Sequence, residues 1–435
     1  MGWEGGAIMD QVVCKPFSLP TITTIPMELK KKEHDSLYQY QPFEMETAHD
    51  YRSGGLLAVD VDSELDNLRY EVIRKLGHGE LSTVYLALDT KTRQWVALKA
   101  FNARTSKKME KNDNFEQVVE RANKCDHVMH ELTRFKEKGL NGEHTVQVFE
   151  VMGPSVSVLW NCMLNDAVKK KMTQLRSPMT KKIARQALMG LKELHDAGVV
   201  HGNMDMTNWL LELDSLEEVR RKKLEQDFEE PESFLENVKQ KGAPERIMAD
   251  QPLFKFVKMD GGLHIKLSGM YSSFIENGPP SDGKHPNLHL RTPEAILNPS
   301  QINRSIDIWA MACVMFEMLT GSKLFEFTRT KSKEIDDQHL IEMNNLIGAI
   351  PEKLAANWKP SNAYAKCVGA HGHITPPQDI KPKPILEAHF DNMKPSTIDD
   401  NEASQIKSLL RSMLQYDPSK RPSVDEVLSH PWLAA

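Results

Sequence analysis

The sequence predicts an α+β fold of two lobes, in which a smaller lobe rich in strands precedes a larger, mainly helical lobe. Three observations support this prediction. Short β-like runs follow one another from Tyr70 around a glycine-containing turn. From about Lys181, apolar residues recur at helical spacing. The length of 435 residues is enough for two lobes, each with its own core.

The domain boundaries follow from changes in composition. Residues 1–50 mix Pro, Lys and Gln-Tyr pairs without sustained periodicity, and we interpret them as a mobile N-terminal leader. Residues 51–152 are expected to form the small lobe with its connection to the next lobe, and residues 153–435 the large lobe. The charge-dense stretch 212–251 is predicted to be a solvated helical insert or loop of the large lobe.

In the small lobe, "YEVIRKLG", "STVYLALD", "QWVALKAF" and "HTVQVFEVM" are predicted strands, and "NDNFEQVVERANK" has helical character. In the large lobe, "KKIARQALMGLKELHDAG" predicts an amphipathic helix that stops at its glycine. "SIDIWAMACVMFEMLTG" is apolar nearly all round, as in a buried helix. "LFKFVKMDGGLHIKL" predicts two strands around a turn at Asp260, and the last stretch predicts two helices around a Pro-containing turn.

Composition limits the classes of function. The formal net charge of −6 argues against a general nucleic-acid binder. No apolar run approaches the ~18 residues of a membrane span. The five cysteines are scattered without metal-ligand spacing, which favours reduced thiols in the cytosol or nucleus. We therefore expect a cytoplasmic or nuclear monomer without direct nucleic-acid or membrane binding.

Two motifs indicate phosphate binding. In "LGHGELSTVYLALD", Gly77 and Gly79 allow a strand–turn–strand to lie close over phosphates, although Ser82 stands where a third glycine is usual. Lys99 in "VALKAF" is placed to neutralise phosphates and to pair with a helix carboxylate, Glu116 or else Glu120. Each motif alone is compatible with a plain hairpin or an exposed lysine. Their order and spacing make the pair more specific.

A third motif is "HGNMDMTN", in which His201 and Asn208 have the separation of the protein-kinase catalytic loop. The chain resembles the eukaryotic protein-kinase family here, and also in "LRTPEAIL", "DIW" and "DPSKRPS". The resemblance covers roughly residues 70–433. It implies that Glu294 pairs with Arg421 to fix the activation segment, and that Asp307 braces the catalytic loop.

Within that family, the chain is most similar to the SR-protein kinases, especially filamentous-fungal members, through "GHGELSTVYLALD", "LNGEHTVQVFEVMG" and "DDQHLIEMNNLIGAIP". SR-protein kinases phosphorylate serines in Arg/Ser-rich splicing factors. The resemblance implies that Phe149 is the gatekeeper of an ATP site and that the backbones of Glu150 and Met152 receive adenine. The apolar residues around adenine would be Val84, Ala97 and Leu210.

The catalytic pattern fails at two carboxylates. Asn203 stands where the family has the aspartate that accepts the substrate proton, and an amide cannot accept that proton at neutral pH. This general-base contribution is worth roughly 10²- to 10⁴-fold in rate. Gly269, in Gly269-Met270-Tyr271, stands where the family has its magnesium-binding aspartate, which leaves Asn208 as a weak metal ligand.

A third departure is Asp205, which replaces a lysine near the transferred phosphate and is expected to repel phosphate charge. Two alternatives would preserve the chemistry. Asp260 would have to be a displaced metal ligand, but turn chemistry favours a hairpin. Asp205 would have to act as the base, although two residues along an extended loop move a side chain by roughly 6–7 Å.

Two hypotheses remain. The favoured one is a pseudokinase that binds ATP, has weak or absent Mg²⁺ dependence and acts through a protein partner, which would be Arg/Ser-rich. The alternative is an active Ser/Thr kinase that transfers the ATP γ-phosphate to serine in Arg/Ser-rich proteins. A phosphotransfer assay and a nucleotide titration separate the two.

Overall fold

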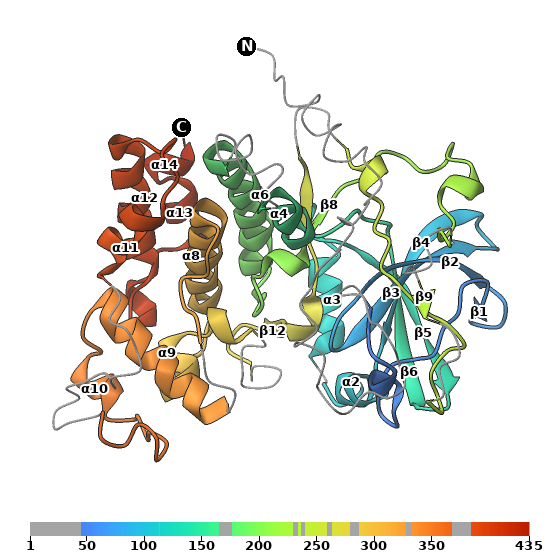
Figure 1. Cartoon of the computed structure of the whole chain (residues 1–435), viewed down its shortest axis with the longest axis horizontal. Helices are drawn as coiled ribbons and strands as arrows, with labels where there is room; N and C mark the ends of the chain where they lie inside the picture. The colour runs from blue at the N-terminus through green and yellow to red at the C-terminus, as the bar shows by residue number, and fades with distance from the viewer. Residues whose placement is uncertain are drawn as a thin grey trace, which may run out of the picture. The chain divides into compact units, whose positions relative to one another are not determined.

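The computed structural model describes residues 45–112, 114–164, 176–228, 234–235, 240–258, 263–278, 287–327, 332–367 and 384–434. These residues form two compact units. The β-rich unit holds the described residues of Met1–Asp113, Met129–Pro154 and Leu211–His264. The helical unit holds those of Asn114–Val128, Ser155–Leu210 and Ile265–Ala435. The predicted α+β class, with a β-rich part and a mainly helical part, is confirmed (Figure 1).

An antiparallel sheet with strand order β1-β2-β3-β4-β6-β5 forms the centre of the β-rich unit (Figure 1). All four strand predictions of the small lobe are confirmed. The strands are β1 (Glu64–Leu65), β2 (Tyr70–His78), β3 (Ser82–Asp89), β4 (Gln94–Phe101), β5 (Glu131–Gly139) and β6 (Gly142–Phe149). One face of the sheet contributes Val72, Tyr85, Leu98 and Val148 to a buried apolar cluster. The β-branched and aromatic residues of these segments favour strands, and the central strands β3, β4 and β6 are largely buried on both faces.

The segment from Leu211 to His264 belongs to the β-rich unit, not to the large lobe as expected, and its described part is a partly exposed loop with several buried residues. Leu216, Leu224 and Leu253 are buried in a cluster with Leu86 of β3. Charged residues separate these leucines in the sequence, so the segment shows no apolar periodicity. The segment contains a 3-10 helix η5 (Arg221–Lys223) and the paired strands β9 (Phe234–Leu235) and β10 (Ile247–Met248).

The predicted hairpin around Asp260 is also corrected. Its first run contains the 3-10 helix η6 (Phe254–Phe256). The backbone amide of Phe256 donates a hydrogen bond to the Leu253 carbonyl within this turn. The second run is a strand, β11 (Ile265–Leu267), which pairs with β8 (Trp209–Leu211). Asp260 itself lies outside the described residues.

The predicted leader, residues 1–50, lies outside the described residues up to residue 44, whereas residues 45–50 belong to the described structure. Met45, Ala48 and Tyr51 are buried in a small cluster with Ile247, and residues Ala48–Tyr51 form the 3-10 helix η2. The capping box between Thr47 and Asp50 fixes this turn. The end of the leader is therefore part of the β-rich unit.

The helical unit is built around α8 (Ser305–Thr320), whose side chains are almost all buried, as predicted. Helix α6 (Arg176–Asp196) packs against α8 through its predicted apolar face and ends before Gly198, whose φ is +69°. The remaining α-helices described in this unit are α3 (Phe115–Ala122), α4 (Val156–Leu164), α7 (Pro293–Leu297), α9 (Ser332–Ile347), α10 (Glu352–Ala355), α11 (Leu386–Met393), α12 (Asp400–Met413), α13 (Val424–Leu428) and α14 (Pro431–Ala434).

Short strands and 3-10 helices hold the loops of the helical unit. Strand β7 (Val199–Val200) pairs with β12 (Phe274–Ile275), so the two ends of the segment from His201 to Ser273 lie together. Between them lie the 3-10 helices η4 (Met206–Asn208) and η7 (Met270–Ser272). The other 3-10 helices of this unit are η8 (Leu288–Leu290), η9 (Pro299–Gln301) and η11 (Pro418–Lys420).

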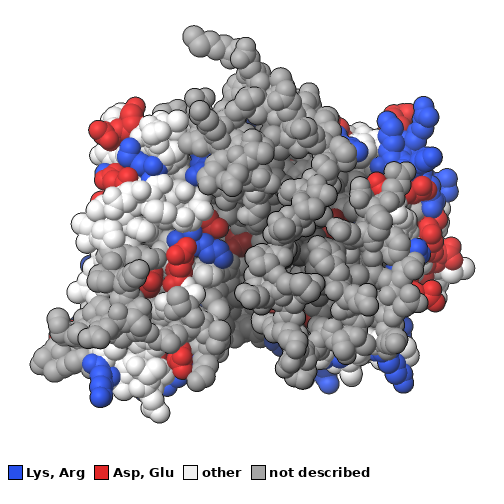
Figure 2. Space-filling view, viewed as in Figure 1, with Lys and Arg blue, Asp and Glu red and all other residues white. Residues whose placement is uncertain are grey.

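On the face drawn in Figure 2, described Lys and Arg side chains lie interspersed with Asp and Glu. Among the described residues, no helix combines the length and the apolar character that crossing a membrane requires.

Candidate functional site: a kinase-like nucleotide face and a degenerate catalytic loop

The predicted nucleotide-binding residues of the β-rich unit lie on one face of its sheet. Gly77 is opposite Val84 in the β2–β3 pair, and Val84 is opposite Lys99 in the β3–β4 pair. Ala97, two residues before Lys99, is opposite Phe149 of β6. Directly opposed residues share a face, as do residues two apart along a strand. The register therefore brings these five residues together.

Both glycines of the first motif face open space. A Cβ atom added at Gly77 or Gly79 meets nothing within 4 Å, and neither glycine has a positive φ. The fold of the unit thus makes no steric demand for glycine at these positions. The absence of side chains leaves room for a ligand to approach the backbone, as phosphate binding requires.

Lys99 is half-buried, and desolvation lowers its pKa to about 8. Its ammonium lies 5.2 Å from the centre of the Phe101 ring, a cation–π distance. Within the described part of the β-rich unit, no carboxylate forms an ion pair with Lys99. An anionic phosphate at this face would therefore compensate a poorly solvated cation.

The segment after β6 is the predicted connection that receives adenine. Phe149 and Met152 are buried, and Glu150 is half-buried. The Glu150 carboxylate accepts a hydrogen bond from the His130 backbone amide at 3.2 Å. The Glu150 side chain thus contacts the segment just before β5.

In the helical unit, Asp307 organises the catalytic loop. Its carboxylate accepts hydrogen bonds from the backbone amides of His201 (2.9 Å) and Gly202 (2.8 Å). It also bonds the His195 ring at 2.9 Å. Gly202 has φ +75°, and a Cβ there would lie 2.6 Å from the Ser272 carbonyl, so the loop requires glycine at this position.

His201 and Asp307 are buried, and their pKa values reflect this. Burial lowers the pKa of His201, against the opposing influence of Asp307. Burial alone would raise the pKa of Asp307, but the His195 hydrogen bond and nearby histidines outweigh it and leave that pKa lowered. The His201 ring therefore stays neutral at pH 7, and one ring nitrogen donates to the Ser268 carbonyl at 2.9 Å.

Asn203 stands at the position that the resemblance assigns to the catalytic base. Its backbone carbonyl accepts a hydrogen bond from the Asn208 side chain at 2.9 Å. Its side-chain oxygen Oδ1 is buried and has no hydrogen-bond partner among the described residues. Because an amide has no basic electron pair at neutral pH, this oxygen can accept a hydrogen bond but cannot take a proton.

Gly269 stands at the position that the resemblance assigns to a metal-binding aspartate, and the Asn208 side chain would have to shift to admit a side chain there. Gly269 has φ +86°, a conformation that residues with a Cβ rarely adopt. A Cβ built there would lie 2.5 Å from Asn208 Oδ1 and 2.7 Å from Asn208 Cγ. The Asn208 amide thus fills the space that an aspartate at residue 269 would need.

Asp205 has structural partners. Its Oδ1 accepts hydrogen bonds from the Thr207 amide (2.8 Å) and hydroxyl (2.6 Å), which caps η4. Its Oδ2 accepts a hydrogen bond from the Asn287 side chain at 2.5 Å. Three donors therefore hold this carboxylate, and the arrangement disfavours Asp205 as a replacement base.

The ion pair that the resemblance implies forms deep in the helical unit. Arg421 donates to both carboxylate oxygens of Glu294, at 2.6 and 2.7 Å, and both side chains are fully buried. The pair joins α7 to the turn before α13. Met270 is half-buried in η7, which packs against α3.

Two predicted site residues lie in a different unit from the residues that they are expected to contact. Glu116 lies on the exposed side of α3 and Leu210 lies in β8, both in the helical unit, whereas Lys99 and Ala97 are in the β-rich unit. The pairing of Lys99 with Glu116 and the contact of Leu210 with adenine therefore stay predictions.

Sequence reasoning missed a cluster beside the glycine motif. Lys75 and His78 of β2 contact Asp250, and Lys75 also contacts Glu46. Asp250 is far along the chain in the charged insert, where it is one acidic residue among many. No local signal in the sequence distinguishes it.

The family's cofactors differ in how well this site suits them. The nucleotide face has open glycines, an apolar row and a lysine, which suit ATP. The magnesium position has no carboxylate at residue 269 and an amide in its place. Hard divalent cations prefer carboxylate oxygens, so the described residues there do not suit Mg²⁺.

The fold and the catalytic loop together define a protein of the kinase class. The protein kinase domain family matches residues 70–223 and 273–433, which is most of the chain. The chain therefore belongs to the protein kinase family.

Known relatives refine this assignment at low identity. Protein kinase dsk1 of Schizosaccharomyces pombe is 24% identical over 89% of this chain and 85% of its own length. Serine/threonine-protein kinase SRPK of Physarum polycephalum is 27% identical over 90% and 92%. Human SRSF protein kinase 3 is 22% identical over 90% of each. The chain is thus an SR-protein-kinase-like member of the family.

A solved kinase domain supports the fold. Its crystal structure matches 87% of this chain and 98% of its own, with a TM-score of 0.56 and 21% sequence identity. This similarity concerns the fold alone.

Proposed function

We propose that this protein is a pseudokinase of the SR-protein-kinase-like group, which holds a nucleotide but is impaired in phosphotransfer. One observation carries the proposal. The space in which the magnesium-binding carboxylate would stand is filled by the Asn208 amide, beside a glycine with φ +86°. At the neighbouring base position, Asn203 offers an amide in place of a carboxylate.

Phosphoryl transfer depends mainly on positioning and on cancelling negative charge. The two missing carboxylates would have anchored the metal and accepted the acceptor proton. In their place stand Asn203 and Gly269, and the neighbouring Asn208 side chain donates to the Asn203 backbone carbonyl at 2.9 Å. The two asparagine amides can orient an acceptor hydroxyl, but they supply neither the base nor a strong metal ligand.

The nucleotide-binding half retains the groups that holding ATP requires. Lys99 provides a cation on the same face as Gly77, and Ala97 and Phe149 provide apolar surface. ATP binding is therefore proposed to be largely independent of magnesium.

A nucleotide titration tests this proposal. Binding of labelled ATP to the full chain is measured in EDTA and in excess magnesium. We expect saturable binding with affinities within about threefold of each other. A gain of tenfold or more in magnesium, about 1.4 kcal/mol, would show that another group holds the metal and would contradict the proposal.

The alternative function is a Ser/Thr kinase with residual activity. The intact loop framework favours it, since Asp307 still orders His201 and Gly202, and Arg421 still holds Glu294. If Asp205 supplied the base, Asp205→Asn would abolish residual transfer, whereas the three hydrogen bonds to its carboxylate predict no specific loss.

The proposed partner is a protein, and the resemblance to SR-protein kinases suggests Arg/Ser-rich sequences. An inactive domain of this fold would act by binding such a protein as scaffold or competitor. We propose a monomer in the cytoplasm or nucleus. Pull-down with an Arg/Ser-rich peptide, compared with a Lys/Ser peptide of equal charge, tests the partner chemistry.

A further inference from the structure

The outer edge of β2 is covered by the charged insert. The backbone amide of Gln226 donates to the Ile73 carbonyl at 3.1 Å. The side-chain oxygen Oε1 of Gln226 accepts a hydrogen bond from the backbone amide of Lys75 at 3.0 Å. The Gln251 amide donates to the Lys75 carbonyl at 2.9 Å. These bonds occupy backbone groups that a sheet edge otherwise exposes. The insert therefore binds directly to the strand that leads into the glycine turn.

An irregularity in β2 turns Lys75 and His78 to the same face. Residues three apart in a regular strand point to opposite faces. Here Lys75 is opposite Tyr85 and His78 is opposite Thr83, with a register shift between Lys75 and Gly77. Because Tyr85 and Thr83 are two apart, Lys75 and His78 share their face, and Gly77 belongs to the other face.

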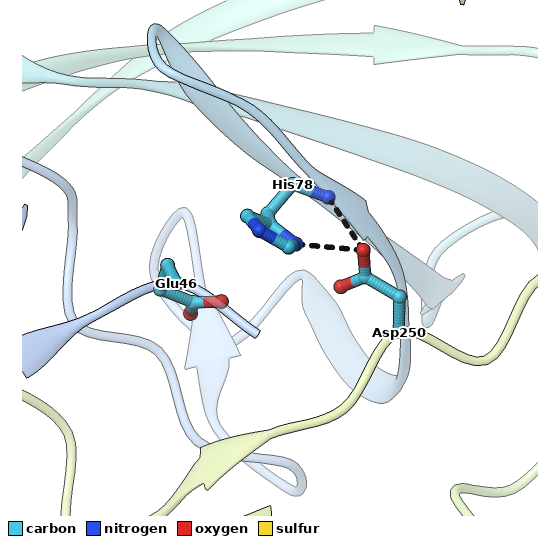
Figure 3. A group of neighbouring side chains, drawn as sticks. All are labelled: Glu46, His78 and Asp250. Atoms are coloured by element: carbon cyan, nitrogen blue, oxygen red, sulfur yellow. Dashed lines mark hydrogen bonds and ion pairs between the residues drawn. The ribbon is translucent and has the colours of Figure 1, made fainter. Parts of the chain in front are cut away.

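His78, which lies between the two glycines of the motif, is held by Asp250 of the insert. The His78 ring nitrogen Nδ1 donates to Asp250 Oδ2 at 2.7 Å, and the His78 backbone amide donates to the same oxygen at 3.2 Å (Figure 3). One carboxylate oxygen thus fixes both the main chain and the side chain of the central residue of the glycine turn.

Asp250 is in turn held by a buried lysine. Lys75 Nζ lies 3.2 Å from Asp250 Oδ1, contacts a Glu46 carboxylate oxygen and donates to the Met248 carbonyl at 2.8 Å. Burial, and then the charge of Glu46 and of Asp250, raises the pKa of the neighbouring Tyr85. Lys75 of β2 therefore links Glu46, at the end of the leader, to Asp250 of the insert.

The spacing in this cluster also resembles a metal site, because ligand atoms of Glu46, His78 and Asp250 lie within 4.8 Å of one another (Figure 3). The Lys75 ammonium already pairs with both carboxylates. A metal ion would have to displace the Lys75 ammonium or bind beside this like charge. The geometry therefore favours an internal ion-pair network.

We propose that Asp250 is a positioning residue for nucleotide binding, which holds the turn around Gly77 and Gly79 through His78. This inference rests on the proposed ATP binding. Gly77, Val84 and Lys99 present the nucleotide face of the β2–β3 hairpin, while His78 and Lys75 anchor it from the opposite face. The insert thereby sets the shape of the phosphate-binding turn without contacting the ligand.

Nucleotide titration of four variants tests the proposal. Asp250→Ala and His78→Ala are each expected to weaken magnesium-free ATP binding about five- to tenfold, less than the full contribution of a charge-assisted hydrogen bond because the contact acts on the ligand only through the position of the turn. The double variant should bind about as weakly as Asp250→Ala alone, because the Asp250 carboxylate accepts both the ring and the backbone-amide bond of His78. Asp214→Ala, a matched change at an exposed aspartate of the same insert, should bind like wild type.

A conservative substitution separates positioning from bulk stability. In His78→Asn, the side-chain amide can donate from nearly the place of Nδ1, so affinity should return to within about twofold of wild type. If His78→Asn binds as weakly as His78→Ala, or if folded Asp250→Ala binds ATP as wild type does, the proposal is overturned.

Amide hydrogen exchange in the nucleotide-free protein tests the anchor separately from the proposed function. Exchange across residues 76–84 should be faster in Asp250→Ala than in wild type, and unchanged in Asp214→Ala. If wild type binds no ATP but this difference appears, the nucleotide proposal fails while the anchor stands. Equal exchange in the two proteins overturns the anchor itself.

Discussion

At the scale of single residues, the surroundings of Gly269 give the proposed loss of a metal ligand its clearest structural support. The positive φ of Gly269 and the Asn208 amide 2.5 Å from a built Cβ both oppose a side chain. Restoring an aspartate there is therefore a structural problem as well as a chemical one. The environment of the position has adapted to glycine.

Gly269→Ala should lower the free energy of unfolding by about 1–3 kcal/mol, because it adds backbone strain and displaces Asn208. Urea denaturation measures the change. Gly79→Ala is the matched control, since its Cβ meets open space, and it should change stability by no more than about 0.5 kcal/mol. Equal effects of the two substitutions would contradict this account of Gly269.

Lys99 gives a prediction about pH. Desolvation lowers its pKa to about 8, and phosphate binding needs the charged form. Magnesium-free ATP affinity should therefore be steady near pH 7 and fall about tenfold by pH 9, as the free protein loses the Lys99 proton. Lys99→Arg should remove this fall, because arginine stays charged. An unchanged fall in Lys99→Arg would assign the titration to another group.

At the scale of elements, the contact between α7 and the turn before α13 depends on a buried ion pair. Glu294→Gln leaves Arg421 buried without its counter-charge and should cost about 3–5 kcal/mol of unfolding free energy. Chemical denaturation provides the measurement.

The control for this change is the partly exposed Glu276–Arg304 pair, whose side chains are 21% and 45% exposed. Glu276→Gln should cost no more than about 1 kcal/mol. Similar losses of unfolding free energy at both sites would contradict the view that the buried Glu294–Arg421 pair stabilises the contact between these elements.

Local sequence patterns predicted elements well where periodicity and burial agree. Helices α6 and α8 and the strands β2, β3, β4 and β6 follow from the spacing of their apolar residues. The insert was misjudged because Leu216, Leu224 and Leu253 are separated by charged residues and gain their burial from β3, which is distant in sequence. Such burial depends on tertiary contacts that no local window contains.

At the scale of the whole molecule, buried histidines link stability to pH. Burial lowers the pKa of His144, His201 and His339. Below pH about 6.5 the unfolded chain binds these protons and the native chain resists them, so stability should fall as pH falls. Each such group contributes up to about 1.4 kcal/mol per pH unit.

His339→Leu isolates one of these contributions. The variant keeps an apolar side chain among Phe325 and Phe327 but removes the titration. Denaturation at pH 7 and pH 5.5 should show a smaller loss of stability in the variant than in wild type. The same loss in both proteins would contradict the assignment.

The sequence names candidate site residues, which stay predictions, but it does not give their detailed geometry. The motifs located Gly77, Lys99, Asn203 and Gly269 because each has a fixed place in a catalytic pattern. The Asn208 amide in the space beside Gly269 and the three donors to Asp205 depend on side-chain directions within a folded loop. The Asp250–His78 contact joins residues 172 positions apart, and only the folded β-rich unit reveals it.

The central claim is that two carboxylates essential for phosphotransfer are absent and that nothing replaces them. A single-turnover assay with γ-labelled ATP, excess magnesium and an Arg-Ser peptide tests it most directly, with an intact SR-protein kinase as the positive control. The account predicts that wild type transfers no label above the peptide-free background. Label transfer at a rate comparable with the control would contradict it.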